Sequence, residues 1–236
     1  MFDLFSDPVK VAQQMEIIFS EYGFAIWETM YALILEVIFA YVVGLPMGVL
    51  LVTGEKEGIR PLPGWLMKVL NVVINLLRSV PFLILMIIAL PLSKIIVGTK
   101  VGTAATIPPM VIAAFPLVAR MVESSLREVN QGVIEASQSM GASAWQIVTK
   151  VMLPEALPSL ISGGTITVGT ILGYGAMAGI IGGGGLGKMA INYGYYNFKY
   201  LVMWAAVIGL ILLVQIFQSV GGKLATACDK RLRNRN

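Results

Sequence analysis

Two charged residues, Glu36 and Arg78, lie inside stretches that are otherwise apolar enough to cross a membrane. An ionisable side chain at membrane depth is costly, so it indicates either a function or a specific partner. Counted at about 1.5 Å per residue from the outer ends of their stretches, the two lie roughly 18 and 21 Å deep. We expect a structural ion pair between them. The alternative is that Glu36 faces water or carries a proton.

A glycine-rich run at residues 182–187, GGGGLG, has the spacing of a nucleotide-binding loop, because Gly182, Gly184 and Gly187 fit G-x-G-x-x-G. The context does not fit. A dinucleotide-binding fingerprint follows a strand, and a phosphate-binding loop has Ser or Thr after its lysine, where this chain has Met189 after Lys188. We therefore interpret the run as a flexible turn or a shallow re-entrant loop.

Composition excludes several other chemistries. The chain has no histidine and a single cysteine, Cys228, so a Ser–His–Asp set, a metal site of clustered thiolates and an internal disulfide are all impossible. We expect no catalytic residues, no metal and no cofactor. Of the 236 residues, 57% are hydrophobic and only 13% are charged, against about a quarter charged in ordinary soluble domains. The sequence thus predicts an all-α integral membrane protein that binds no nucleic acid.

Five apolar segments reach the roughly 20 residues that a helix needs to cross a bilayer. They are residues 24–52, 69–92 with Pro81 in mid-helix, 101–122, 157–181 and 201–225. Five spans place the termini on opposite sides. With the N-terminus outside, eleven Lys and Arg residues lie in the cytoplasm and five outside, which predicts an N-out, C-in orientation. We divide the chain into an external or interfacial segment, 1–23, a transmembrane domain, 24–225, and a basic cytoplasmic tail, 226–236.

A polar island between the third and fourth segments, within residues 131–154, predicts two short helices. Gly141 suits the left-handed position that ends the first helix, and Ser143 with Gln146 has the spacing of a capping box that begins the second. Pro154 should end that second helix, because it lacks an N–H group. Neither helix is long enough to span a bilayer.

This island resembles the cytoplasmic "EAA" loop of ABC-importer permeases. The pattern is matched at the correct spacing by Glu135, Ala136, Gly141, Leu153 and Pro154. Ser137 and Val151 depart from it by small changes of volume. The resemblance implies that the loop forms coupling helices that sit in a cleft of the ATP-hydrolysing subunit, so that this chain is a permease and not itself an enzyme. An amphipathic interfacial loop without a partner is the alternative.

Further runs are most similar to permeases of methionine ABC importers, namely residues 44–51, 78–82, 119–123, 173–187 and 193–195. The resemblance implies five transmembrane helices, a homodimer in the bacterial inner membrane, two ATP-binding subunits, and a lipid-anchored or periplasmic methionine-binding protein. In the fourth segment, which is rich in small residues, Tyr174 and Met177 are the bulky groups, so we expect them to close a pore whose wall includes Ala176. Met177 is the expected gate.

Three other functions remain open from the sequence. The chain could import another small amino acid or organic solute through the same machinery. A secondary transporter would use Glu36 for ion coupling, but five helices without an evident inverted repeat fit that class poorly. A membrane scaffold would also carry a docking loop, but it would not need so many prolines and glycines in its spans. The chirality of the methionine is not fixed by these motifs.

Overall fold

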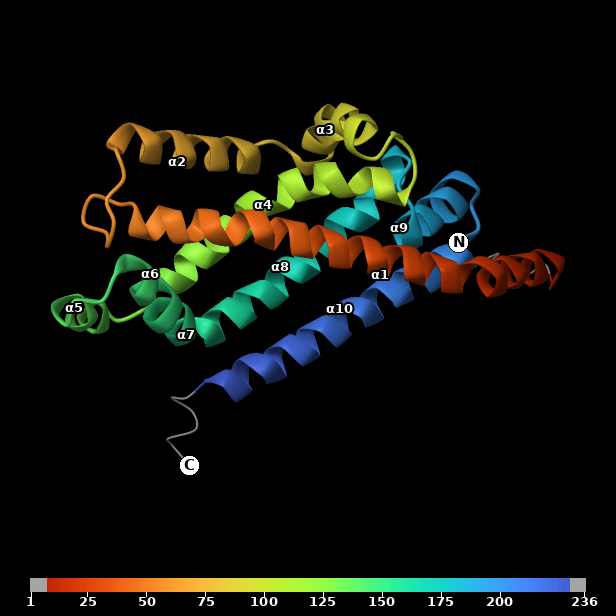
Figure 1. Ribbon diagram of the computed structural model, residues 1–236. Helices are drawn as coiled ribbons and strands as arrows, with labels where there is room; N and C mark the ends of the chain where they lie inside the picture. Colours follow the sequence, from red (N-terminus) through yellow and green to blue (C-terminus); the bar gives the residue numbers. More distant parts are fainter. Residues whose placement is uncertain (1–7, 230–236) are drawn as a thin grey trace. The chain divides into compact units, whose positions relative to one another are not determined.

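The computed structural model describes residues 8–229, and all of its regular elements in that range are helical (Figure 1). The first seven residues, and the residues of the predicted basic tail from Lys230 onward, lie outside the described range. In chain order the α-helices are α1 (Pro8–Thr53), α2 (Gly64–Ser79), α3 (Phe82–Ile96), α4 (Thr103–Arg127), α5 (Gln131–Ser139), α6 (Ala144–Ile147), α7 (Leu153–Glu155), α8 (Leu157–Ala178), α9 (Gly185–Met189) and α10 (Tyr200–Cys228). Two π-helical turns, Val148–Met152 and Ala190–Tyr196, and one 3₁₀ turn, Gly179–Ile181, continue three of them.

Four helices of the described range, α1, α4, α8 and α10, are long and apolar enough to cross a membrane. The count becomes five if α2 and α3 are taken as one interrupted span. The all-α membrane architecture predicted from the sequence is therefore confirmed.

Two predicted segments differ from the observed helices. The first helix begins at Pro8 rather than at Phe24, so the predicted external segment is partly helical. The second segment is interrupted: α2 ends at Ser79, Val80 is extended with φ −76° and ψ 131°, and α3 begins after Pro81. Proline has no N–H to donate and disfavours a helical conformation at the residue before it, which explains why Pro81 precedes a helix instead of lying in the middle of one.

The chain forms two compact units, each assembled from three stretches. Within the described range, unit 1 comprises residues 8–38, 81–113 and 169–216, and unit 2 comprises residues 39–80, 114–168 and 217–229. Helices α1, α4, α8 and α10 each contribute to both.

In unit 1, the N-terminal half of α1 packs against α9 and α10. Its core consists of Ala25, Leu186, Met189, Val202 and Ala206, all buried. Two long-range hydrogen bonds fix the same contact: the Tyr22 hydroxyl donates to the Ala205 carbonyl oxygen at 3.1 Å, and the Leu201 N–H donates to the side-chain oxygen of Gln14 at 3.0 Å.

In unit 2, two glycines bring α1 and α4 into direct backbone contact. A Cβ atom added at Gly44 would lie 2.7 Å from the Cβ atom of Val118, and one added at Gly48 would lie 2.6 Å from the carbonyl oxygen of Ala119 and from the Cβ atom of Val122. Small residues allow such close approach between membrane helices. Around this contact, Leu51, Met67, Ile74 and Ala119 form a buried cluster.

The contact between α1 and α4 predicts that Gly48→Ala destabilises the protein. Alanine normally favours a helix over glycine by about 1 kcal/mol, but the clash with α4 should outweigh this and lower the free energy of unfolding by about 1–3 kcal/mol. Thermal unfolding of the purified protein in detergent measures the effect. The control is Gly222→Ala on α10, where a Cβ atom meets nothing within 4 Å. Equal melting temperatures for the two variants would contradict the close contact.

Candidate functional site

The polar island folds as predicted, into two short helices with a sharp turn between them. The side-chain oxygen of Asn130 caps α5 by accepting from the N–H of Gly132 at 2.8 Å. Gly141 has the left-handed φ of +80° that ends the first helix. The Ser143 N–H donates to the side-chain oxygen of Gln146 at 2.8 Å, and the Gln146 N–H donates to the Ser143 hydroxyl at 3.4 Å, so the capping box is complete.

The end of the second helix differs from the prediction, because Pro154 does not terminate it. The chain passes from α6 through the π-helical turn Val148–Met152 into α7, which contains Pro154 and reaches Glu155. In the π turn the N–H of Leu153 bonds to the carbonyl oxygen of Val148, five residues back. The wider turn thus accommodates a proline that would interrupt an ordinary α-helix.

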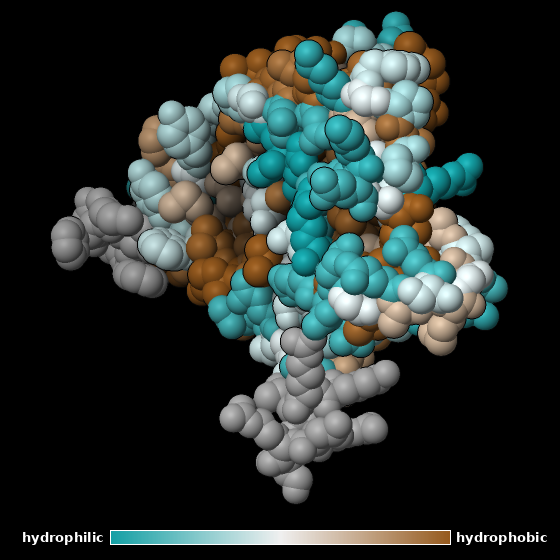
Figure 2. Space-filling model, turned by 90° about the vertical axis from the view of Figure 1, so that its left-hand side faces the viewer, coloured by the Kyte–Doolittle hydropathy of each residue, from teal (hydrophilic) through white to brown (hydrophobic). Residues whose placement is uncertain are grey.

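One face of this loop is anchored in unit 2 and the opposite face is exposed. Ile134, Ser137, Ile147, Val148 and Met152 are buried. The predicted coupling residues Glu135, Ala136, Gly141 and Pro154 are exposed, and Leu153 is half-buried. Two large apolar side chains are also exposed, Met140 at 81% and Trp145 at 75%. Figure 2 views the end of the molecule that carries α5 and α6, and hydrophilic residues gather across its middle with hydrophobic residues beside them. The loop therefore presents a surface on which polar residues and large apolar side chains are both exposed.

Behind the loop lies an ionic network that the sequence analysis did not identify. The Arg127 guanidinium donates to Glu55 at 2.6 Å and to Glu123 at 2.8 Å. Glu55 and Arg127 border a cavity of about 520 Å³ that Glu135 and Gln138 also line. The only sequence signal was the four-residue spacing of Glu123 and Arg127 on one helix. The network joins the end of α4 to the segment after α1, next to the predicted coupling residues.

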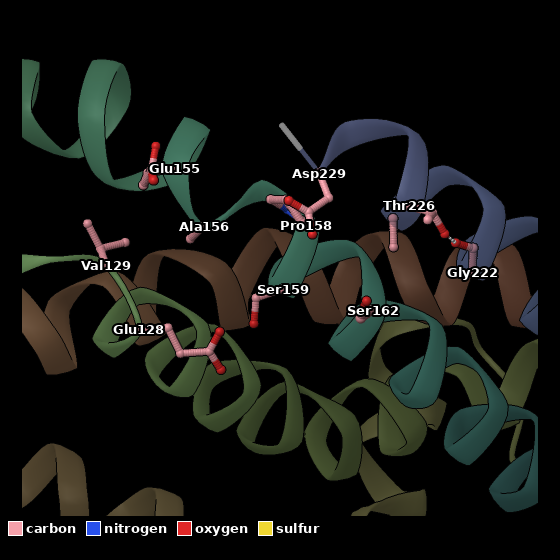
Figure 3. A pocket seen from close by; sticks show the side chains of 11 residues that line it. Glu128, Val129, Glu155, Ala156, Pro158, Ser159, Ser162, Gly222, Thr226 and Asp229 are labelled. Carbon is pink, nitrogen blue, oxygen red and sulfur yellow. Dashed lines mark hydrogen bonds between the residues drawn. The ribbon is translucent and has the colours of Figure 1, made fainter. Parts of the chain in front are cut away.

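A second polar cavity of unit 2, about 480 Å³, lies where α4, α7, α8 and α10 end or begin. Figure 3 shows the side chains of Glu128, Glu155 and Asp229 around it, with Ser159 of α8. Glu155 and Asp229 already make interactions of their own, so their charges do not assign a ligand to this cavity.

The three predicted passage residues all lie on α8 in unit 1, but not on one face. Met177 is 47% exposed, and Tyr174, three residues earlier, lies on the same side of the helix with its ring stacked on Phe82 at 4.2 Å between ring centroids. Ala176 faces elsewhere: its backbone packs against Gly187. The structure thus groups Tyr174 with Met177 and separates Ala176 from them.

The glycine-rich run is held in place by two α1 residues that the sequence analysis missed, Glu28 and Thr29. The Gly185 N–H donates to the Glu28 carboxylate at 2.9 Å, and the Leu186 N–H donates to the Thr29 hydroxyl oxygen at 2.9 Å. The Thr103 hydroxyl donates to the other oxygen of Glu28 at 2.6 Å. The backbone N–H groups that a phosphate would need are therefore already bonded. No sequence pattern linked residues 157 positions apart.

The glycines of this run allow backbone conformations and close contacts that other residues would not. Gly182 and Gly185 have φ values of +90° and +73°, and a Cβ atom at Gly184 would collide with Thr103 and Glu28. The segment is a turn, as expected, but it is fixed by hydrogen bonds and does not serve as a flexible linker.

The two predicted intramembrane charges belong to different units. Glu36 lies on α1 in unit 1 and is 2% exposed, whereas Arg78 lies in the last turn of α2 in unit 2. The ion pair between them stays a prediction.

Near the start of α10, Tyr193 connects α1 to the π-helical turn of residues 190–196. Its hydroxyl donates to the Glu21 carboxylate at 2.6 Å, and the Lys199 amine lies 5.4 Å from the centre of its ring. The hydrogen bond to Glu21 raises the pKa of Tyr193 because the bond requires the hydroxyl proton. The contact therefore persists at neutral pH.

Comparison with known proteins gives consistent matches over most of the chain. Residues 44–233 match the family model described as "binding-protein-dependent transport system inner membrane component". A probable D-methionine transport system permease protein from Vibrio cholerae is 48% identical over 88% of this chain and 92% of its own length. A methionine import system permease protein from Bacillus subtilis is 44% identical over 70% of this chain and 74% of its own length.

Two solved structures of ABC transporters are similar to this chain in fold. A chain of the MetNI methionine ABC transporter, in a structure described as inward facing, superposes with a TM-score of 0.88 at 40% identity, covering 91% of this chain and 99% of that one. A chain of an amino acid ABC transporter, only 16% identical, has a TM-score of 0.65 and shares the fold.

The bonds to the glycine-rich run predict that Glu28→Ala loosens it. Hydrogen bonds to a charged group contribute about 1.5–3 kcal/mol each, so amide exchange in residues 182–189 should accelerate by about tenfold or more. Hydrogen–deuterium exchange with mass spectrometry measures this. Glu16→Ala, at an exposed position on the same helix, is the control. Unchanged exchange in Glu28→Ala would show that Glu28 does not hold the run.

Proposed function

Because the chain belongs to the family of binding-protein-dependent transport system inner membrane components, we propose that it is the permease subunit of an ATP-driven methionine importer. The observation that carries the proposal is the loop of α5 to α7, whose buried face is anchored in unit 2 while its coupling residues are exposed. The choice of methionine as the substrate rests on the similar proteins, which are named as methionine or D-methionine transport permeases. We therefore include both enantiomers.

In the proposed mechanism, two copies of the chain span the bacterial inner membrane N-out and C-in, and two separate ATP-binding subunits dock on the coupling loops. ATP closes these subunits, and their movement reaches the membrane helices through Glu135–Pro154. The passage then opens outward and receives methionine from a lipid-anchored or periplasmic binding protein. The rigid capping of α5 and α6 supports this role, because a loop that transmits movement must not deform.

The exposed face of α8 supports a passage at the contact between two copies. Gly173 and Met177 of α8 are exposed at helical spacing with Ile180 of the 3₁₀ turn that continues the helix, and a Cβ atom at Gly173 meets nothing within 4 Å of this chain. An apolar face with Tyr174 beside it suits the thioether side chain of methionine, while small residues leave room for its charged backbone groups. We propose Met177 as the gate, with Tyr174 beside it and Ala176 behind.

Gly141→Trp should uncouple transport. At φ +80° a side chain is strained, but the position opens to empty space, so the fold should persist while the bulky ring blocks docking of the ATPase. We expect loss of the ATPase stimulation that methionine-loaded binding protein produces in the assembled complex. The matched control is Gly98→Trp, which has the same constraint, φ +83° and open space, outside the loop.

Two outcomes would contradict the proposed function, one for the coupling loop and one for the substrate. Normal stimulation in Gly141→Trp would remove the loop from the coupling route. Stimulation by other loaded amino-acid-binding proteins, and none by the methionine-loaded one, would keep the importer architecture and reject methionine.

Met177→Ala should open the gate. Removing an exposed thioether side chain from the face of the passage should raise ATP-independent leak of methionine through proteoliposomes, with ATP hydrolysis no longer matched to transport. Met15→Ala, also at an exposed methionine, is the control. A tight membrane with normal coupling in Met177→Ala would exclude Met177 as the gate.

A further inference from the structure

Unit 1 contains a small cavity onto which a buried carboxyl group opens. The cavity has a volume of about 20 Å³. Its polar wall consists of Glu28, Thr29 and Glu36 of α1 with Thr103 and Thr106 of α4. Its remaining wall is formed by Leu, Ala and Gly residues of α1, α8, α10 and the glycine-rich run. Glu36 is only 2% exposed, and no other residue of the described range 8–229 makes a hydrogen bond or an ion pair with its side chain.

The size of the cavity limits what it can hold. About 10–15 Å³ suffices for one water molecule, provided that the water finds two or more polar partners. A cavity of 20 Å³ is therefore large enough for one water and far too small for an amino acid. The cavity is therefore not the substrate passage itself, although Ala176, proposed to lie behind the gate, also lines it.

The two carboxyl groups on the wall have different surroundings. The oxygens of Glu28 accept from the Thr103 hydroxyl and the Gly185 N–H, donors that suit an ionised carboxylate. Glu36 has no such donor in the described part of the chain. A second negative charge, buried on the wall of the same small cavity and without a donor, is strongly disfavoured. Apart from Glu28 and Glu36 themselves, no residue that lines the cavity from α1, α4, α8, α9 or α10 is titratable.

A protonated carboxyl is both a donor and an acceptor, so it can bind a water on one side of the cavity. On the α4 side of the cavity, the Thr106 hydroxyl donates to the Thr103 carbonyl oxygen at 2.7 Å, which leaves its lone pairs free to accept. We propose that the cavity is a hydration site, in which one ordered water accepts from a protonated, uncharged Glu36 and donates to two of the three acceptor oxygens that Glu28, Thr103 and Thr106 offer. This assignment competes with the ion pair to Arg78.

Substitutions at Glu36 separate the two assignments. Glutamine is uncharged and keeps a donor and an acceptor, whereas leucine keeps neither. In the full complex in lipid nanodiscs, we expect Glu36→Gln to melt within about 2 °C of the wild type and Glu36→Leu to melt at least about 4 °C lower. Glu16→Gln, an exposed change on the same helix, is the control. Equal losses in Glu36→Gln, Glu36→Leu and Arg78→Gln would overturn the proposal in favour of the ion pair.

Infrared spectroscopy tests the proton directly. At neutral pH the wild type should show the carbonyl band of a buried protonated carboxylic acid, and Glu36→Gln should lack it. Absence of that band from the wild type would overturn the proposal. A melting temperature that rises with sodium in the wild type, but not in Glu36→Gln, would overturn it too, because the cavity would then hold a cation.

Discussion

Every backbone N–H and C=O group inside a bilayer must find a partner within the protein, because hydrocarbon offers none. Most of this chain meets the requirement by remaining helical. Where the helix after α8 is interrupted, side chains replace the lost partners: Glu28 and Thr29 accept from the N–H groups of Gly185 and Leu186. The interruption is therefore possible only where α1 lies beside it. At this break, long-range polar contacts satisfy the backbone, whereas the break between α2 and α3 follows from the local chemistry of Pro81.

The loop of α5 to α7, which follows α4, also depends on contacts that replace missing helical hydrogen bonds. Its helices are too short to be stable alone, so they depend on capping and on burial of one face. Asn130, Ser143 and Gln146 satisfy the helix ends, and Ile147 and Met152 provide the anchor. What remains exposed can bind a partner without disturbing the fold. This division of the loop into an anchored and an exposed face is the physical basis of the proposed coupling to an ATPase.

Local signals in the sequence predicted local structure well. Apolar length indicated the spans, and the Gly141 turn and the capping box of Ser143 with Gln146 formed as expected because each depends on residues within one turn. Proline was less predictable. Pro81 lies between two helices, whereas Pro154 is accommodated by a π-helical turn, and which of these occurs depends on packing that the sequence does not display. The ionic network of Glu55, Glu123 and Arg127 escaped notice for the same reason.

We propose that this chain carries methionine across the membrane when a separate subunit hydrolyses ATP. Uptake of labelled methionine can be measured in proteoliposomes that contain the chain with its ATPase and binding protein. We expect uptake that requires ATP and is competed by unlabelled L- and D-methionine. An assembled complex that hydrolyses ATP but accumulates no methionine, or one that accumulates it without ATP, would contradict this transport function.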